Sequence, residues 1–291
     1  MNRREFLASA VLVPRIAQSL TTEGWRLFEI GTHVHVQNAR GITRAWLPTP
    51  LVGMPYQQTL GDTYHAEGGT SVMVESEDVD MLFTEWPAGA DPILTMTSRV
   101  ATRDHAVDLA TPRVPPPPDL SKFARYLHAT RTMPSDGALK AAADQMTRGA
   151  GTDIEKARAI FDGLLREKGA DSTASAAHEH FVALARVAGV PTRPVYGLRL
   201  GSAASSKAQL CRAETYLVGF GWVPVDLSEG LFGRWTAPWV AFNVAHDVTL
   251  PRSTGRSLPS FMYPQAETAS GRADSQSPDT FRYEITVREG T

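Results

Sequence analysis

The sequence predicts an α+β protein in which an N-terminal antiparallel β domain precedes a core of helices packed on an antiparallel sheet. Two observations predict this class. Between residues 25 and 112, apolar and polar residues alternate in short runs that Gly, Pro and Asp interrupt. From residue 119 onward, apolar residues recur with helical spacing. The 291 residues are enough for about two domains.

The β domain, residues 25–112, contains six runs that predict strands. They are residues 25–30, 33–36, 44–48, 70–74, 81–86 and 93–101. Short alternating strands with turn residues between them are typical of an antiparallel sandwich. Four prolines, Pro115 to Pro118, come next, and polyproline is stiff and has no backbone donor for strand pairing. We therefore expect residues 113–118 to be a linker.

The core, residues 119–233, begins with helical patterns. Helices are expected over residues 120–129, 138–147, 152–165 and 174–188. Thr152 and Glu155 form a capping box at the start of the third helix, which Gly169 ends. Gly189 and Pro191 end the fourth helix. Strands are predicted over residues 192–200, 210–218 and 222–226, and a C-terminal β extension over residues 234–291.

The composition excludes several classes of protein. A formal charge of −2 and a pI near 6.5 give no electrostatic footprint for nucleic acid or an anionic membrane. A single cysteine excludes an internal disulfide framework. Beyond the N-terminus, no apolar run approaches the roughly 20 residues of a membrane span. No membrane-spanning segment is therefore expected in the mature chain.

The first 20 residues have the pattern of an export signal. Arg3 and Arg4 are followed by Phe6 and Leu7 and a short apolar run, as in a twin-arginine signal. A working signal would place the protein in the periplasm or outside the cell. Without one, the chain would remain in the cytoplasm as a protein with a frayed N-terminus.

Several motifs recur in the order of a known family. FVALAR is followed by GVPTRP, then SKAQLCRAE, then GWVPVD, while RAWLPTPL and EWPAG precede them in the β domain. From about Trp25 onward, the chain resembles the bacterial transglutaminase-like cysteine enzymes, a branch of the papain-like thiol fold. The resemblance implies a papain-like helix-plus-antiparallel-sheet core behind a β domain. It also implies a catalytic Cys, His and Asp.

Two of those three catalytic positions hold hydrocarbon. The family Cys, seven residues before the Phe of FVALAR, corresponds to Ala174, and the family His corresponds to Leu210. The family Asp is present as Asp226. Ala174 has no nucleophilic atom, Leu210 cannot transfer a proton, and Asp226 has no imidazole on that strand to orient. The segment that leads from Gly169 to Ala174 is also shorter than the corresponding segment of active relatives. This pattern predicts a pseudoenzyme.

Two substitute nucleophiles deserve comparison. Cys211 adjoins the former His position, but neighbouring residues of a strand point to opposite faces. Cys211 is therefore expected to point away from the cleft between the core helix and the sheet, as a small buried thiol. Ser175 and His178 are one helical turn apart and would form a dyad, although Ser near a helix start is more often a cap. Neither candidate has an identifiable acid.

The other residues expected near the vestigial cleft have structural interpretations. Arg212 and Glu214 share one strand face and are predicted to pair with each other. Trp222 either lines the cleft or packs in the core. Asp226 is expected to face the open end of the cleft or to accept backbone donors, without strong desolvation.

No metal or cofactor site is predicted. His178 and His180 diverge on a helix, and His33 and His35 share a strand face without a third ligand at recognisable spacing.

Because two of the three catalytic positions hold hydrocarbon, the sequence favours a non-catalytic module that binds peptide or protein segments. The alternative is an active amidase, protease or transamidase that uses a non-standard nucleophile, with Ser175 or Cys211 as the candidates.

Overall fold

The computed structural model describes most of the chain. The described residues are 24–76, 78–115, 119–130, 136–167, 174–200, 209–236, 239–255, 257–273 and 279–290. The expected export segment, prolines 116–118 and Gly169 lie outside them. Within the described residues, no helix combines the length and apolar character needed to cross a membrane.

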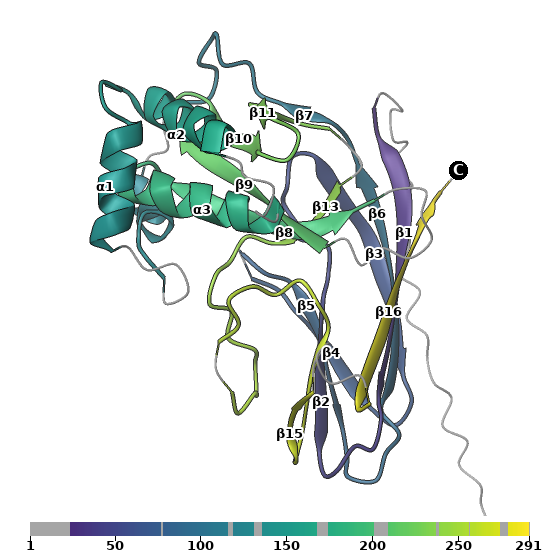
Figure 1. The fold of residues 1–291 in the computed structure, drawn as a ribbon. Coiled ribbons are helices and arrows are strands. Elements are labelled where there is room, and N and C mark those ends of the chain that lie inside the picture. Colours follow the sequence, from purple (N-terminus) through teal and green to yellow (C-terminus); the bar gives the residue numbers. More distant parts are fainter. Residues whose placement is uncertain are drawn as a thin grey trace, which may run out of the picture.

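The N-terminal region forms a sandwich of two antiparallel sheets, as the sequence predicts (Figure 1). One sheet has the order β16 (Phe281–Glu289), β1 (Arg26–Val36), β6 (Ile93–Thr102) and β3 (Gln57–Ala66). The other has the order β15 (Gly271–Ala273), β14 (Gln265–Thr268), β2 (Thr43–Pro48), β5 (Met81–Trp86) and β4 (Thr70–Val74). The facing apolar side chains form one cluster that includes Val34, Leu47, Leu82, Trp86 and Leu94.

The core combines helices with a third antiparallel sheet. Its strand order is β11 (Leu231–Phe232), β10 (Gly221–Asp226), β9 (Gln209–Leu217), β8 (Thr192–Arg199) and β13 (Trp239–Asn243). Its helices are α1 (Gly137–Met146), α2 (Asp153–Glu167) and α3 (Ala174–Val187). They gather at one end of the molecule, away from the long strands of the sandwich (Figure 1). α3 packs on β8 and β9.

Local sequence signals account for the helix ends. Glu155 accepts the Thr152 N–H at 2.9 Å while Thr152 accepts the Glu155 N–H at 3.3 Å, which confirms the capping box. After α3, Gly189 has φ +85°, a left-handed conformation that glycine adopts without strain. The first expected helix is shorter than predicted: it is a 3₁₀ helix, η1 (Leu120–Tyr126), capped by Asp119.

The C-terminal segment is divided between the sandwich and the core. β13 pairs with β8, whereas β14 joins β2 and β16 joins β1. β12 (Arg234–Trp235) pairs with β7 (His105–Ala106), which the first domain supplies. Buried Gln57 connects the two parts, since its amide donates to the Leu51 and Ala241 carbonyls and accepts the Ala241 N–H. The two parts therefore share a continuous set of buried contacts.

Candidate functional site

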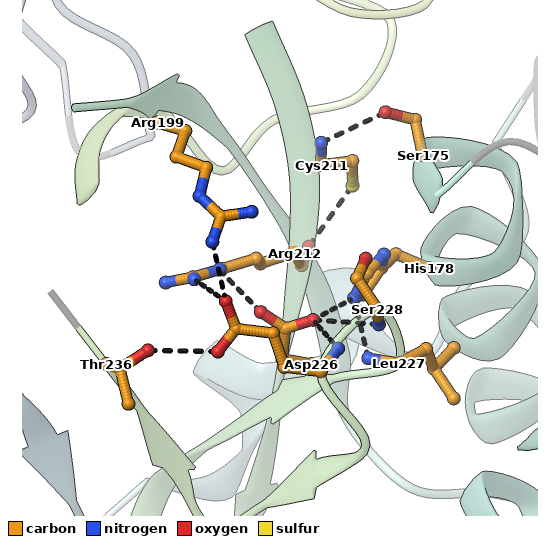
Figure 2. Close-up of polar contacts among 10 residues, drawn as sticks. Ser175, His178, Arg199, Cys211, Arg212, Asp226, Leu227, Ser228 and Thr236 are labelled. Atoms are coloured by element: carbon orange, nitrogen blue, oxygen red, sulfur yellow. Dashed lines mark hydrogen bonds and ion pairs between the residues drawn. The ribbon is translucent and has the colours of Figure 1, made fainter. Parts of the chain in front are cut away.

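The candidate site lies where α3 meets β9 and β10 (Figure 2). α3 begins at Ala174 and buries Phe181, Leu184 and Ala185 against the sheet. This packing follows from the helical spacing of those three residues. It brings His178, in the second turn of α3, against Asp226 at the end of β10.

Asp226 is a buried carboxylate with several donors. The Arg212 Nε lies 2.8 Å from its Oδ2. The backbone N–H groups of Ser228 and Glu229 donate to Oδ1 at 2.8 and 3.1 Å. The His178 Nε2 lies 3.6 Å from the same oxygen. Asp226 therefore does accept backbone donors as expected, but the expectation that it escapes desolvation is wrong, since the residue is 2% exposed.

These contacts keep Asp226 ionised. Burial alone would raise its pKa, but the Arg212 charge and the Glu229 N–H outweigh burial and hold the pKa well below its usual value. His178 accepts the Leu227 N–H on Nε2 at 2.9 Å, so a neutral ring carries its proton on Nδ1. The His178 imidazole therefore hydrogen-bonds to the backbone of the turn after β10.

The predicted pairing of Arg212 with Glu214 is wrong. Arg212 pairs with Asp226, and its guanidinium lies 4.6 Å from the Trp239 ring centre. Glu214 is fully buried and pairs with Arg193, its direct neighbour on β8, at 2.7 Å. The prediction chose the nearest opposite charge along one strand, whereas both charges find partners on the adjacent strands.

The two candidate nucleophiles are engaged structurally. The Cys211 thiol is buried, which raises its pKa well above the usual value, and its Sγ contacts the Arg212 carbonyl oxygen at 3.1 Å. The Ser175 hydroxyl accepts the Cys211 N–H at 3.1 Å, whereas His178 accepts the Leu227 N–H. Figure 2 shows Ser175 directed to Cys211 and His178 directed to the turn after Asp226, so the two residues do not form the alternative dyad.

Leu210 belongs to an apolar cluster. It packs against the group formed by Leu51, Met54, Trp235 and Trp239, on the face of β9 opposite Cys211. The alternation predicted for β9 is therefore present. Leu210 is therefore a partly buried apolar residue that packs on this cluster.

The remaining predicted residues lie apart from Asp226. Trp222, at the start of β10, makes edge-on contacts with Tyr126 and Tyr216 and a tilted contact with Phe123, and the Arg193 guanidinium lies 4.0 Å from its ring centre. His35 contacts Asp91 at 3.0 Å. Over the part of the chain that the structure describes, no group of three or more His, Cys, Asp or Glu residues is arranged to hold a metal ion.

An apolar cavity of about 410 Å³ adjoins the first turn of α3. It is lined by Leu164, Leu165, Glu167, Ala176, Ala177, His180 and Leu227. Leu227 follows Asp226 directly, and Ala177 lies one helical turn beyond Ala174. The cavity is therefore adjacent to the position of the family nucleophile. His180 faces it from the surface while His178 is buried, which confirms that the two histidines diverge.

Comparison with known proteins agrees with this geometry. Residues 171–227 match the model of the transglutaminase-like superfamily. The chain carries a transglutaminase-like core. An uncharacterized protein of Haemophilus influenzae is 28% identical over 87% of this chain and 88% of its own length. The match spans α3, β8, β9 and β10, the elements that surround Asp226 in the transglutaminase-like core.

One of the solved structures compared shares the fold. A candidate cysteine protease from Cytophaga hutchinsonii superposes with a TM-score of 0.62 at 13% identity, covering 92% of this chain and 91% of that chain. The periplasmic domain of TgpA from Pseudomonas aeruginosa gives a TM-score of 0.35 at 14% identity, over 69% of this chain and 88% of that chain. The first similarity extends the shared fold beyond the transglutaminase-like core to nearly the whole chain.

We predict that Asp226→Asn lowers the free energy of unfolding by about 2–4 kcal/mol, because buried Arg212 then loses its close counter-charge and keeps only Glu229, at 4.0 Å. Asp162→Asn, which breaks an exposed pair with Arg158, should cost about 0.5 kcal/mol or less. Urea unfolding of both variants measures the difference. Equal stabilities for the two variants would contradict a structural role for Asp226.

Acid should also weaken the native protein through Asp226. The folded pKa lies below the unfolded value of about 3.9, so the unfolded chain binds more protons in acid. The contribution is present above the unfolded pKa and is lost as the pH falls toward the folded pKa. Unfolding free energies measured between about pH 5 and pH 2 should therefore fall more steeply for the native protein than for Asp226→Asn. Parallel curves would disprove this assignment.

Proposed function

We propose that this chain is a non-catalytic transglutaminase-like protein that binds a peptide or protein segment beside the start of α3. The observation that carries the proposal is the state of Asp226: Arg212 and two backbone N–H groups occupy its carboxylate, and Leu210 replaces the base it would orient. If residues 1–20 direct export, the protein acts in the periplasm.

Catalysis by another nucleophile has little support. A buried thiol with a raised pKa is protonated at neutral pH, and Cys211 has no base. The Ser175 hydroxyl oxygen accepts the Cys211 N–H. Among the residues that the structure describes, no imidazole forms a hydrogen bond with Ser175. Without a proton acceptor, a serine hydroxyl is a weak nucleophile.

The cavity beside α3 supports peptide binding. Leucine and alanine side chains provide most of its lining, and its volume of about 410 Å³ is sufficient for a large apolar side chain. Replacing Cys and His by Ala and Leu makes the neighbouring surface drier. Apolar burial is therefore the main source of affinity expected there. The ligand predicted by these features is a segment that presents a bulky apolar residue.

We predict that the native protein shows neither amide hydrolysis nor amine transfer above the level of Ser175→Ala and Cys211→Ala. An Ala174→Cys/Leu210→His double variant, assayed in parallel, supplies the nucleophile and base in the same fold. Turnover by the double variant alone would mean that the substrate cleft persists and that chemistry was lost at these two positions. Native turnover that either single variant abolishes would overturn the proposal.

A second experiment tests binding directly. Ala176 is exposed and lines the cavity, so Ala176→Trp should fill the cavity without disturbing the core. Peptides selected from a library by the native protein should bind this variant at least tenfold more weakly. Ala141→Trp, the same change at an exposed site on α1, is the matched control and should bind normally. No selected peptide, or equal binding by both variants, would count against this cavity.

A further inference from the structure

The two edges of the sheet formed by β16, β1, β6 and β3 differ in how well they are protected (Figure 1). At the β3 edge the register shifts between Thr59 and Gly61, and Asp62 turns a carboxylate toward the inner face, opposite buried Ser98. Bulges and inward charges on an edge strand oppose pairing with a further strand. β16 has neither feature in its paired part: it pairs with β1 over nine consecutive residues without a register shift. The β16 edge is therefore open to another strand.

The hydrogen bonds at the two ends of β16 show which of its backbone groups face this open edge. The Gln37 N–H donates to the Thr280 carbonyl, and the Gly290 N–H donates to the Leu27 carbonyl. Both pairs continue the register of β1 with β16, in which hydrogen-bonded pairs alternate with non-hydrogen-bonded pairs. Even-numbered residues of β16 therefore bond to β1. The N–H and C=O groups that point to the open edge belong to Phe281, Tyr283, Ile285, Val287 and Glu289.

The outer face of the sheet carries a row of alternating charges that ends at β16. Arg99 on β6 lies opposite Glu29 on β1, and the Arg99 Nε is 3.5 Å from the Glu29 Oε1. Glu29 in turn lies opposite Arg288 on β16. Arg288 is exposed, and so is Glu284, which precedes it on the same face of the strand. A carboxylate beyond Arg288 would continue the alternation.

We propose that β16 pairs with β16 of a second copy of this chain, antiparallel, about a two-fold axis at Thr286. In this register Ile285 of one copy lies opposite Val287 of the other, so the outward backbone groups of both strands pair with each other. Glu284 of each copy lies opposite Arg288 of the other. These charged residues occupy non-hydrogen-bonded positions, where facing side chains are closest. The row of alternating charges then continues from one copy into the next.

The charges of β16 disfavour the neighbouring registers. A shift of two residues in one direction places Arg282 opposite Arg288, and like charges directly opposite each other are destabilising. The same shift in the other direction places Glu284 opposite Gly290, which offers no charge. A two-fold contact uses the same edge of both copies, so the joined sheet ends at the two protected β3 strands. The pairing therefore closes as a dimer and does not grow into a fibre.

The test measures self-association of the full chain by sedimentation velocity between about 1 and about 200 µM, where the native protein should change from monomer to dimer. Glu284→Arg places like charges at both ends of the contact and should weaken dimerisation by about tenfold. The exchange Glu284→Arg/Arg288→Glu restores both pairs and should recover dimerisation to within about threefold of the native protein. Any repulsion from Glu29 in this variant acts equally in the monomer and the dimer.

The matched control is Glu75→Arg, the same charge change at an exposed residue between β4 and β5 of the other sheet. It should dimerise within about twofold of the native protein. A native protein that stays monomeric over the whole range would overturn the proposal. So would equal dimerisation of the native protein and Glu284→Arg, or equal weakening by the control.

Amide hydrogen exchange locates the contact. Raising the protein concentration should slow exchange of the N–H groups of Tyr283, Ile285 and Val287, which point to the open edge in the monomer. A dimer in which these three groups exchange at an unchanged rate uses another surface, and would contradict pairing through β16. Equal protection of the three groups by an unrelated peptide, Thr-Val-Thr-Val-Thr-Val-Thr, would mean that the edge accepts any strand, and would disprove the assignment to a second copy.

Discussion

The buried carboxylate of Asp226 is the contact on which the core depends. It joins β10 to β9 through Arg212 and to the following turn through the Ser228 and Glu229 N–H groups, while His178 of α3 accepts the Leu227 N–H of the same turn. A buried charge is tolerated only when such donors compensate for its lost hydration. These contacts together fix the positions of the N-terminal half of α3, the sheet and the turn after β10 relative to one another.

This use differs from the role that a carboxylate has in a thiol enzyme. There the carboxylate orients an imidazole that exchanges protons with a nucleophile. Here the imidazole near Asp226 comes from α3 and accepts a backbone N–H, and the strongest donor is a guanidinium, which does not titrate in the working range. The Asp226 carboxylate therefore holds the fold together at this point.

The sequence was sufficient to predict the elements with strong local signals. The α1, α2 and α3 helices have caps and apolar spacing. Strand β3 was missed because its sequence, QQTLGDTYHA, is largely polar and belongs to an exposed edge. The division of the C-terminal strands between two parts was not visible either, because strand partners depend on contacts distant in sequence.

The site shows the same limit at the level of side chains. Motif order predicts that Ala174, Leu210 and Asp226 occupy the three family positions. Their partners could not be predicted, since a pattern within one strand reports only which residues share a face. Arg212 and Glu214 share that face, but each is closer to a charge on a neighbouring strand than to the other residue. Cross-strand register, which the sequence does not state, decides the pairing.

Those two ion pairs also explain why hydrocarbon suits position 210. Arg193 with Glu214 connects β8 to β9, and Arg212 with Asp226 connects β9 to β10, so every charge nearby already has its counter-charge. A histidine at position 210 would need a partner, and the Asp226 oxygens are occupied. A partly buried imidazole without a partner stabilises a fold less than an apolar side chain does, and Leu210 adds apolar contact to the cluster of Leu51 and Met54.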